Sequence, residues 1–224
     1  MKPFLTVAIL LCVFQASFGQ SGMKEGESWG DYVQRAAIEF DHLEPVDSYF
    51  DYYEYRIDYH NKIRLFLLDT LNKRPMIRMV VLPSFSSEYV INLEELNGTF
   101  IVTKVIADTS IWYSQNPDYV QNPEELVVKI ETRTISKSLA EKVSDLFETA
   151  MNQTQYNNDG IIGTDGTSYY FTATGSFGWR TATKWSPREG TKINELIRIT
   201  ETLISNELEE AELTEEIENL KSRF

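Results

Sequence analysis

Hydrophobic and polar residues alternate with a period of two through the middle of the chain, and this pattern predicts a block of β-strands. The alternation begins at Met76 and recurs at intervals as far as Trp185. Turn-forming residues, above all Asn, Gly and Pro, separate the runs. The predicted strands cover residues 76–81, 89–96, 99–106, 126–133, 167–174 and 179–185.

The second and third of these runs are joined by Asn97-Gly98, which predicts a β-hairpin with a two-residue type I′ turn. Both central residues of that turn need a positive φ, and Asn and Gly tolerate it best. A loop of two residues also sets the register of the strands. The facing pairs are then Leu93 with Val102, Ile91 with Lys104 and, on the opposite face, Val90 with Val105.

Apolar residues at spacings of three and four predict helices on either side of the strands. The first covers 28–42 and is followed by Pro45. Ser138, with Glu141 three residues later, has the arrangement of a capping box and predicts a helix that runs to about Ala150. Thr191 can cap a further helix over 191–204. The residues expected to face the core on these last two helices are Leu139, Val143, Leu146, Phe147 and Ala150, then Ile193, Leu196, Ile197, Thr200, Leu203 and Ile204.

The segment 49–71 is crowded with aromatic and aliphatic residues that fit a helical face only imperfectly. Tyr and Phe also favour strands, although we predict a helix here. The rings have two alternative roles: they cover one face of a sheet, or they form a platform on which a ligand stacks. We favour the first alternative.

The last segment, 207–224, is acidic but keeps apolar residues at helical spacing. It therefore predicts an amphipathic helix and not a random acidic tail. Such a helix either docks its apolar edge on the domain or offers that edge to a partner. The residues of this edge are Leu213, Ile217, Leu220 and Phe224.

Strands gathered in the middle, with helices between and after them, predict an α+β fold. We expect an antiparallel sheet with helices packed on one face and a C-terminal helix. The expected segments are a signal peptide over 1–19, a flexible N-terminus over 20–27, a single α+β domain over 28–206 and an acidic amphipathic C-terminal helix over 207–224.

The N-terminal segment has the three parts of a secretory signal peptide. Lys2 supplies a positive charge, residues 4–14 are apolar, and Ser17-Phe18-Gly19 places small residues where a signal peptidase cuts. The apolar run is shorter than the ~20 residues of a membrane span. We therefore expect a secreted or periplasmic protein with no membrane insertion after cleavage.

Cys12, the only cysteine, would leave with the signal peptide. The bulky Leu10-Leu11 before it does not match a lipidation signal, which usually has small residues there. The mature chain would then contain no disulfide and no thiol chemistry. Its stability would rest on packing alone.

The formal net charge of −13 excludes some classes of partner. A chain this acidic is repelled by nucleic acid and by anionic membrane surfaces. We therefore expect no nucleic acid partner. The expected partner is a protein or another envelope component.

Few residues point to catalysis or to a bound metal. The only histidines, His42 and His60, have no carboxylate or thiol spacing of a known metal site. The loop 157–160 (Asn-Asn-Asp-Gly) lacks the first carboxylate and the closing glutamate of a calcium loop. We predict no metal and no cofactor. A catalytic pair of carboxylates cannot be chosen from 34 acidic residues. The sequons at Asn97 and Asn152 leave glycosylation open.

One strand carries a candidate binding surface. Residues 179–185 alternate so that two tryptophans share a face with threonines, while Arg180 and Lys184 lie on the other face with Ala182. The basic side could receive an acidic partner, and exposed tryptophan could stack on sugars or anchor a protein. The alternative, which simple alternation favours, is a tryptophan face in the core with charges in solvent. The candidate binding residues are Trp179, Arg180, Lys184 and Trp185.

The last hundred residues or so contain short motifs in a recognisable order. A strand and the helix at Ser138 are followed by a strand with Asp165-Gly166-Thr167 and Tyr170, and then by Trp185-Ser186-Pro187 and a helix with Leu196. This order resembles exported bacterial proteins of uncharacterised activity. The resemblance implies a secreted or periplasmic location and brings no catalytic residues.

The function expected from these observations is non-catalytic binding of a protein or another envelope component, through the sheet or the C-terminal helix. One alternative is a carboxylate-dependent hydrolase that acts on glycans. Another is a periplasmic inhibitor or immunity protein, whose negative charge would suit a basic enzyme.

Overall fold

The computed structural model describes residues 23–47, 49–50, 56–114, 126–156, 165–175, 178–205 and 207–224. The chain forms two compact units, one of residues 1–40 with 157–164 and one of residues 41–156 with 165–224. None of the helices within the described ranges combines the length and the hydrophobicity of a membrane span.

The described part of the first unit is built around α2 (Trp29–Glu39), which confirms the first predicted helix. Ser28 caps its start, since its Oγ accepts a hydrogen bond from the Asp31 amide at 3.2 Å. Arg35 pairs with Glu27 at 2.8 Å and so ties the preceding turn to the helix.

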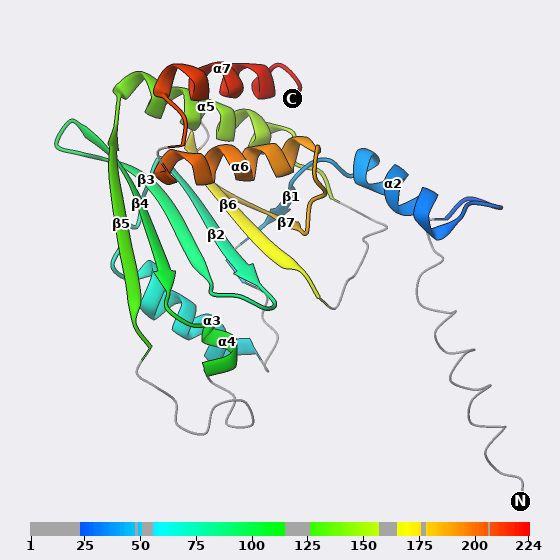
Figure 1. The fold of residues 1–224 in the computed structure, drawn as a ribbon, viewed down its shortest axis with the longest axis horizontal. Helices are drawn as coiled ribbons and strands as arrows, with labels where there is room; N and C mark the ends of the chain where they lie inside the picture. Colours follow the sequence, from blue (N-terminus) through cyan, green and yellow to red (C-terminus); the bar gives the residue numbers. More distant parts are fainter. Residues whose placement is uncertain are drawn as a thin grey trace, which may run out of the picture. The chain divides into compact units, whose positions relative to one another are not determined.

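A seven-stranded sheet forms the centre of the second unit (Figure 1). Its order is β1-β7-β6-β2-β3-β4-β5, and every neighbouring pair is antiparallel. This confirms the predicted α+β class with an antiparallel sheet. The strands are β1 (Glu44–Val46), β2 (Ile77–Pro83), β3 (Tyr89–Leu96), β4 (Thr99–Ala107), β5 (Val128–Ile135), β6 (Thr167–Gly175) and β7 (Gly178–Trp185).

The hairpin between β3 and β4 has the predicted turn and register. Asn97 and Gly98 have φ angles of 52° and 82°, as a type I′ turn requires. The predicted pairs are all present: Leu93 with Val102, Ile91 with Lys104, and Val90 with Val105.

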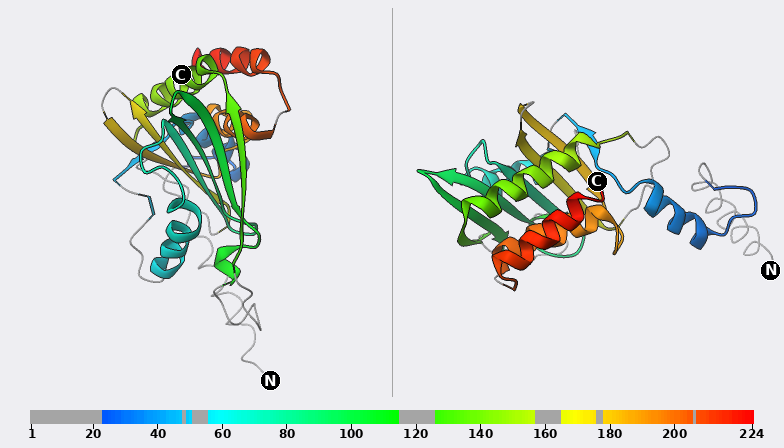
Figure 2. Two further views of the ribbon diagram at one scale, coloured as in Figure 1. Left: turned by 90° about the vertical axis from the view of Figure 1, so that its left-hand side faces the viewer. Right: turned by 90° about the horizontal axis from the view of Figure 1, so that it is seen from above.

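Two helices, α5 (Lys137–Asn152) and α6 (Lys192–Ser205), cover one face of the sheet, and α7 (Glu210–Lys221) packs on these two helices (Figures 1 and 2). Their apolar stripes meet Met79, Ile91 and Phe171 of the sheet in one core. The residues predicted to face inward on α5 and α6 are buried, apart from Ile204, which is partly buried.

The start of α5 differs from the prediction. Ser136, and not Ser138, is the N-cap, and its Oγ accepts a hydrogen bond from the Leu139 amide at 3.2 Å. Ser136 has extended backbone angles directly after β5, whereas Ser138 already lies in the first helical turn. Both serines precede the same apolar stripe, so the spacing alone does not separate them.

The opposite face of the sheet carries a smaller layer of helices. The prediction of helices on one face did not include this layer. It consists of α3 (Ile57–Ile63), the π-helix η2 (Arg64–Leu68) and α4 (Ile111–Ser114). A second core lies between this layer and the sheet, with Ile63 and Leu67 against Val80 and Val90. The helix predicted within 49–71 is confirmed over the described residues of α3 and η2.

The described aromatic residues of 49–71 cover this second face. Phe50 stacks on His60 with ring centroids 4.6 Å apart and meets the edge of Tyr170 on β6 at 5.4 Å. Tyr59 is buried in the same core. The sheet-covering alternative for these rings is therefore the one that the described residues adopt.

Candidate functional site

The two faces of β7 are oriented the other way from the interpretation favoured above, in which the tryptophans face the core and the charges face solvent. Ala182 is fully buried under the large helix layer, so Arg180 and Lys184 share the covered face, while Trp179 is 40 % exposed. The expected tryptophan core is therefore corrected. The reason is size, because the small Ala182 side chain leaves room for the helix layer.

The two cations on β7 have structural partners. Arg180 donates hydrogen bonds to Asn152 Oδ1 at 2.9 Å and to the Met151 carbonyl at 3.5 Å, at the C-terminus of α5. A cation is favourable there because it faces the negative end of the helix dipole. Burial lowers the pKa of Lys184, and the charges of Glu44 and Asp41 oppose that shift. Binding of a ligand by this strand stays a prediction.

The C-terminal helix uses its apolar edge inside the molecule. Leu213, Ile217 and Leu220 are buried in the main core, and Phe224 packs against it. Of the two alternatives for this edge, the structure has the docked one. In this state Leu213, Ile217 and Leu220 are therefore not available to a partner, and Phe224 is partly exposed.

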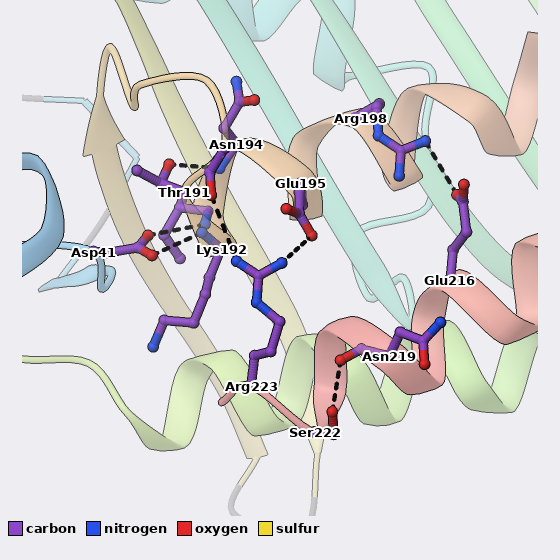
Figure 3. Close-up of polar contacts among 12 residues, drawn as sticks. Asp41, Thr191, Lys192, Asn194, Glu195, Arg198, Glu216, Asn219, Ser222 and Arg223 are labelled. Carbon is purple, nitrogen blue, oxygen red and sulfur yellow. Dashed lines mark hydrogen bonds and ion pairs between the residues drawn. The ribbon is translucent and has the colours of Figure 1, made fainter.

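Charged contacts hold α7 against α6 (Figure 3). Arg223 pairs with Glu195 at 2.5 Å, and Arg198 lies 3.1 Å from Glu216. Asp41 caps the start of α6, since its carboxylate accepts hydrogen bonds from the Lys192 amide at 2.7 Å and the Ile193 amide at 3.1 Å (Figure 3). Further pairs, Lys142 with Glu218 and Lys221 with Asp145, join α7 to α5.

Neither histidine belongs to a cluster of described side chains that could hold a metal. His42 Nδ1 lies 3.2 Å from the Leu43 carbonyl, and His60 is buried beside the Phe50 and Tyr59 rings. Within the described ranges no three His, Cys, Asp or Glu side chains form a group that could hold a metal. The loop 157–160 lies outside the described residues. The glycan-hydrolase alternative stays a prediction.

A fully buried carboxylate, Glu88, was missed from the sequence. Its Oε1 accepts hydrogen bonds from the Tyr59 hydroxyl at 3.0 Å, the Trp112 amide at 3.1 Å and the Ser110 hydroxyl at 3.3 Å. Its Oε2 accepts one from the Ile111 amide at 2.7 Å. Four donors satisfy this charge, so Glu88 fixes α3 and α4 to the end of the sheet. A single glutamate between two strands has no sequence signature of such a role.

The sheet has one long open edge, at β5. Figure 1 shows β5 as the long green strand at the left, and no described strand pairs with its outer side. At the other end of the sheet the edge strand β1 has only three residues. Ile130 on β5 is 53 % exposed, and Thr132 and Thr134 on the same face are also exposed. An edge of this kind can accept a further strand.

The other face of β5 carries charges of alternating sign, on Lys129, Glu131 and Arg133. Lys129 and Glu131 form an ion pair at 2.5 Å. The hydrogen bond from Lys129 lowers the pKa of Glu131, and Lys104, its neighbour on β4, adds to the effect. Arg133 donates to the Leu203 carbonyl near the end of α6 at 3.2 Å. β5 is thus held by its pairing with β4 and by the contact of Arg133 with α6, whereas no described strand pairs with its outer edge.

The two motifs that carried the resemblance meet in space. The Thr167 amide donates to Ser186 Oγ at 2.8 Å, and the Ser186 amide donates to the Thr167 carbonyl at the same distance. Gly166 lies beneath Ser186 and the Trp185 ring, where an added Cβ would be 2.2 Å from Ser186 Oγ and 2.8 Å from ring carbons. The motifs therefore form one structural corner where β6 begins and β7 ends.

Comparison with known proteins gives no family assignment: no family model, curated protein or solved structure matches the chain significantly.

Proposed function

We propose that this chain is an exported, non-catalytic interaction protein that binds a partner protein by adding a strand to β5. The observation that supports this most is an edge strand of eight residues whose outer side meets no described strand. Its exposed face carries Ile130, an apolar side chain that a partner can cover. In strand addition, backbone hydrogen bonds supply affinity and alternate side chains supply selectivity.

The charges on β5 define the partner segment. Opposite charges on directly facing residues stabilise an antiparallel pair, whereas like charges destabilise it. The order Lys129, Glu131, Arg133 therefore favours a partner strand with an acidic, a basic and an acidic residue at the facing positions. Ile130 on the opposite face favours an aromatic or β-branched residue across from it.

The proposal is tested by photo-crosslinking in the organism that produces the protein. A photo-reactive phenylalanine analogue is placed at position 132 on β5 and, as a control, at position 85, where the natural Phe85 is 70 % exposed. We expect a discrete adduct with a second protein from position 132 and none from position 85.

A matched pair of substitutions tests the role of the edge itself. Ile130→Lys puts a charge beside the incoming strand and is expected to abolish the adduct. Phe85→Lys makes the same chemical change at another exposed apolar side chain and should leave the adduct intact. An adduct that survives Ile130→Lys, or no adduct from position 132, would refute the proposal. An adduct only with a second copy of this chain would also contradict a separate partner protein, and would show that β5 mediates self-association.

The inhibitor or immunity alternative is a special case of this proposal. It requires a basic partner, because a net charge of −13 would steer such a partner toward the protein. The yield of the crosslinked adduct should then fall steeply as salt is added, since screening weakens long-range attraction. A yield that does not depend on salt would exclude the electrostatic version and leave strand addition in place.

A further inference from the structure

A row of polar side chains crosses the second face of the sheet, the face that also carries the smaller helix layer. Direct cross-strand partners in an antiparallel sheet point to the same side. Arg78 on the central strand β2 faces Asn92 on β3 and Thr172 on β6. The row continues outward at both ends, and its members in spatial order are Thr181, Thr172, Arg78, Asn92 and Thr103.

Arg78 is the unusual member, because it is a buried cation with only neutral hydrogen-bond acceptors. It is 4 % exposed. Its Nε donates to Asn92 Oδ1 at 3.0 Å, and its Nη2 donates to the Asn72 carbonyl. Among the described residues no carboxylate lies within ion-pair distance of this guanidinium, and Glu94 attracts it only at longer range. A buried charge without a counter-charge is costly, so the position calls for an anion.

Asn92 supplies the second, independent observation. It is fully buried, and its side-chain Nδ2 has no hydrogen-bond partner. The amide orientation follows from Arg78, because Oδ1 must face the guanidinium donor and Nδ2 must point elsewhere. Orphaned buried donors of this kind are rare and mark a missing partner. A cation and an unused N–H donor thus belong to one hydrogen-bonded pair.

The hydroxyl groups on the other side of Arg78 are already engaged. Tyr49 and Thr172 hydrogen-bond to each other through their side-chain oxygens. Burial lowers the pKa of Arg78, while the neighbouring Tyr49 hydroxyl opposes that change. The donor of this row that lacks a hydrogen-bond partner, Asn92 Nδ2, therefore lies on the other side of the guanidinium.

We propose that Arg78 and Asn92 form a binding site for a small organic monocarboxylate. One guanidinium balances one negative charge, and the two oxygens of a carboxylate can accept from the guanidinium and from the Asn92 amide at the same time. A phosphate dianion would leave a surplus charge in buried surroundings. The next residues along the same face, Val80 and Val90, are apolar and lie under Ile63 and Leu67, so an acid with an apolar body would meet apolar side chains there.

The ligand takes the place of the Asn72 carbonyl on Arg78 Nη2. That carbonyl is a neutral acceptor, and a charged acceptor forms the stronger hydrogen bond. The second carboxylate oxygen then accepts from Asn92 Nδ2. The site is independent of the β5 edge, because neither Arg78 nor Asn92 lies on β4 or β5.

The test is a titration of the full chain with sodium benzoate at constant ionic strength, followed by NMR of the Arg78 and Asn92 side-chain N–H signals. We expect saturable shifts with benzoate and none with benzamide, which has the same ring and no charge. Thr103→Val, at the next position of the row, should retain the shifts.

Asn92→Asp provides the decisive variant, because it keeps the side-chain shape and gives Arg78 an internal carboxylate. It should weaken benzoate binding by at least about tenfold while the ligand-free protein melts no lower than the natural one. No saturable shift with benzoate, or full binding by Asn92→Asp, would overturn the proposal. Equal shifts with chloride would mean an adventitious ion only. None of these outcomes bears on crosslinking at position 132, so the two proposals fail separately.

Discussion

At the scale of single residues, Gly166 is the described glycine at which an added methyl group would come closest to its neighbours. An alanine there would press on Ser186 and on the Trp185 ring, both of which are held by the corner between β6 and β7. Overpacking of this kind costs about 1–3 kcal/mol of unfolding free energy. Chemical denaturation of Gly166→Ala measures it.

The matched control is Gly30→Ala, within α2. An added Cβ there meets only Ser28 Oγ at 3.8 Å, and alanine is a better helix former than glycine. Stability should therefore stay the same or rise. Equal unfolding free energies of Gly166→Ala and the natural protein would contradict this prediction, because Ser186 and Trp185 would then shift without loss of stability.

Two buried tyrosines predict sensitivity to alkali. Burial raises the pKa of Tyr59 and of Tyr89, and their carboxylate partners, Glu88 and Glu201, raise it further. The unfolded chain releases these protons near pH 10, whereas the folded chain retains them. This stabilisation is therefore complete below about pH 10 and is lost above it. Denaturation at pH 8 to 11 should show a shallower loss for Tyr89→Phe than for Tyr156→Phe, which removes an exposed hydroxyl.

At the scale of elements, the docked position of α7 predicts that its apolar edge is part of the core. Ile217→Ala should lower the unfolding free energy by about 2–4 kcal/mol, since it leaves a cavity at a fully buried position. Glu215→Ala, on the exposed side of the same helix, should change it by less than about 0.5 kcal/mol. A cost below about 1 kcal/mol for Ile217→Ala would contradict a docked helix.

The elements that the sequence predicted well are those whose signal is local. The β3–β4 hairpin depends on two turn residues, and α5 and α6 depend on stripes within one helix. The cap of α5 at Ser136 and the three-residue strand β1 were missed, because a shift of two residues or a strand of three leaves no periodic signal.

The candidate sites were harder to predict, because burial depends on strands that are distant in sequence. The alternation along β7 shows two faces but not which one the helices cover. Arg78 reads as a solvent-facing residue of β2, yet β3 and β6 on either side bury it. That arrangement exists only after β2 and β6 pair across about ninety residues of sequence.

At the scale of the whole molecule, the proposed export makes a chemical prediction. If the signal peptide is removed after Gly19, the mature protein lacks Cys12 and contains no thiol. Mass spectrometry of protein recovered from the periplasm or medium should show a chain that begins at Gln20, and a thiol reagent should find nothing to modify. An intact chain with a reactive cysteine would contradict export by this route.

The order of strands in the sheet has a consequence for the way the chain folds. A chain that is exported as proposed, N-terminus first, delivers β1 and then β2, β3, β4 and β5, and these last four can pair with one another as they emerge. The free side of β2 then stays unpaired until β6 emerges, and β1 stays unpaired until β7 emerges beside β6. During that interval β2, whose residues are nearly all buried in the finished fold, is itself a sheet edge, and such an edge is prone to mispairing. We therefore expect that aggregation during biogenesis, more than the stability of the finished fold, limits the yield of variants in β6 and β7.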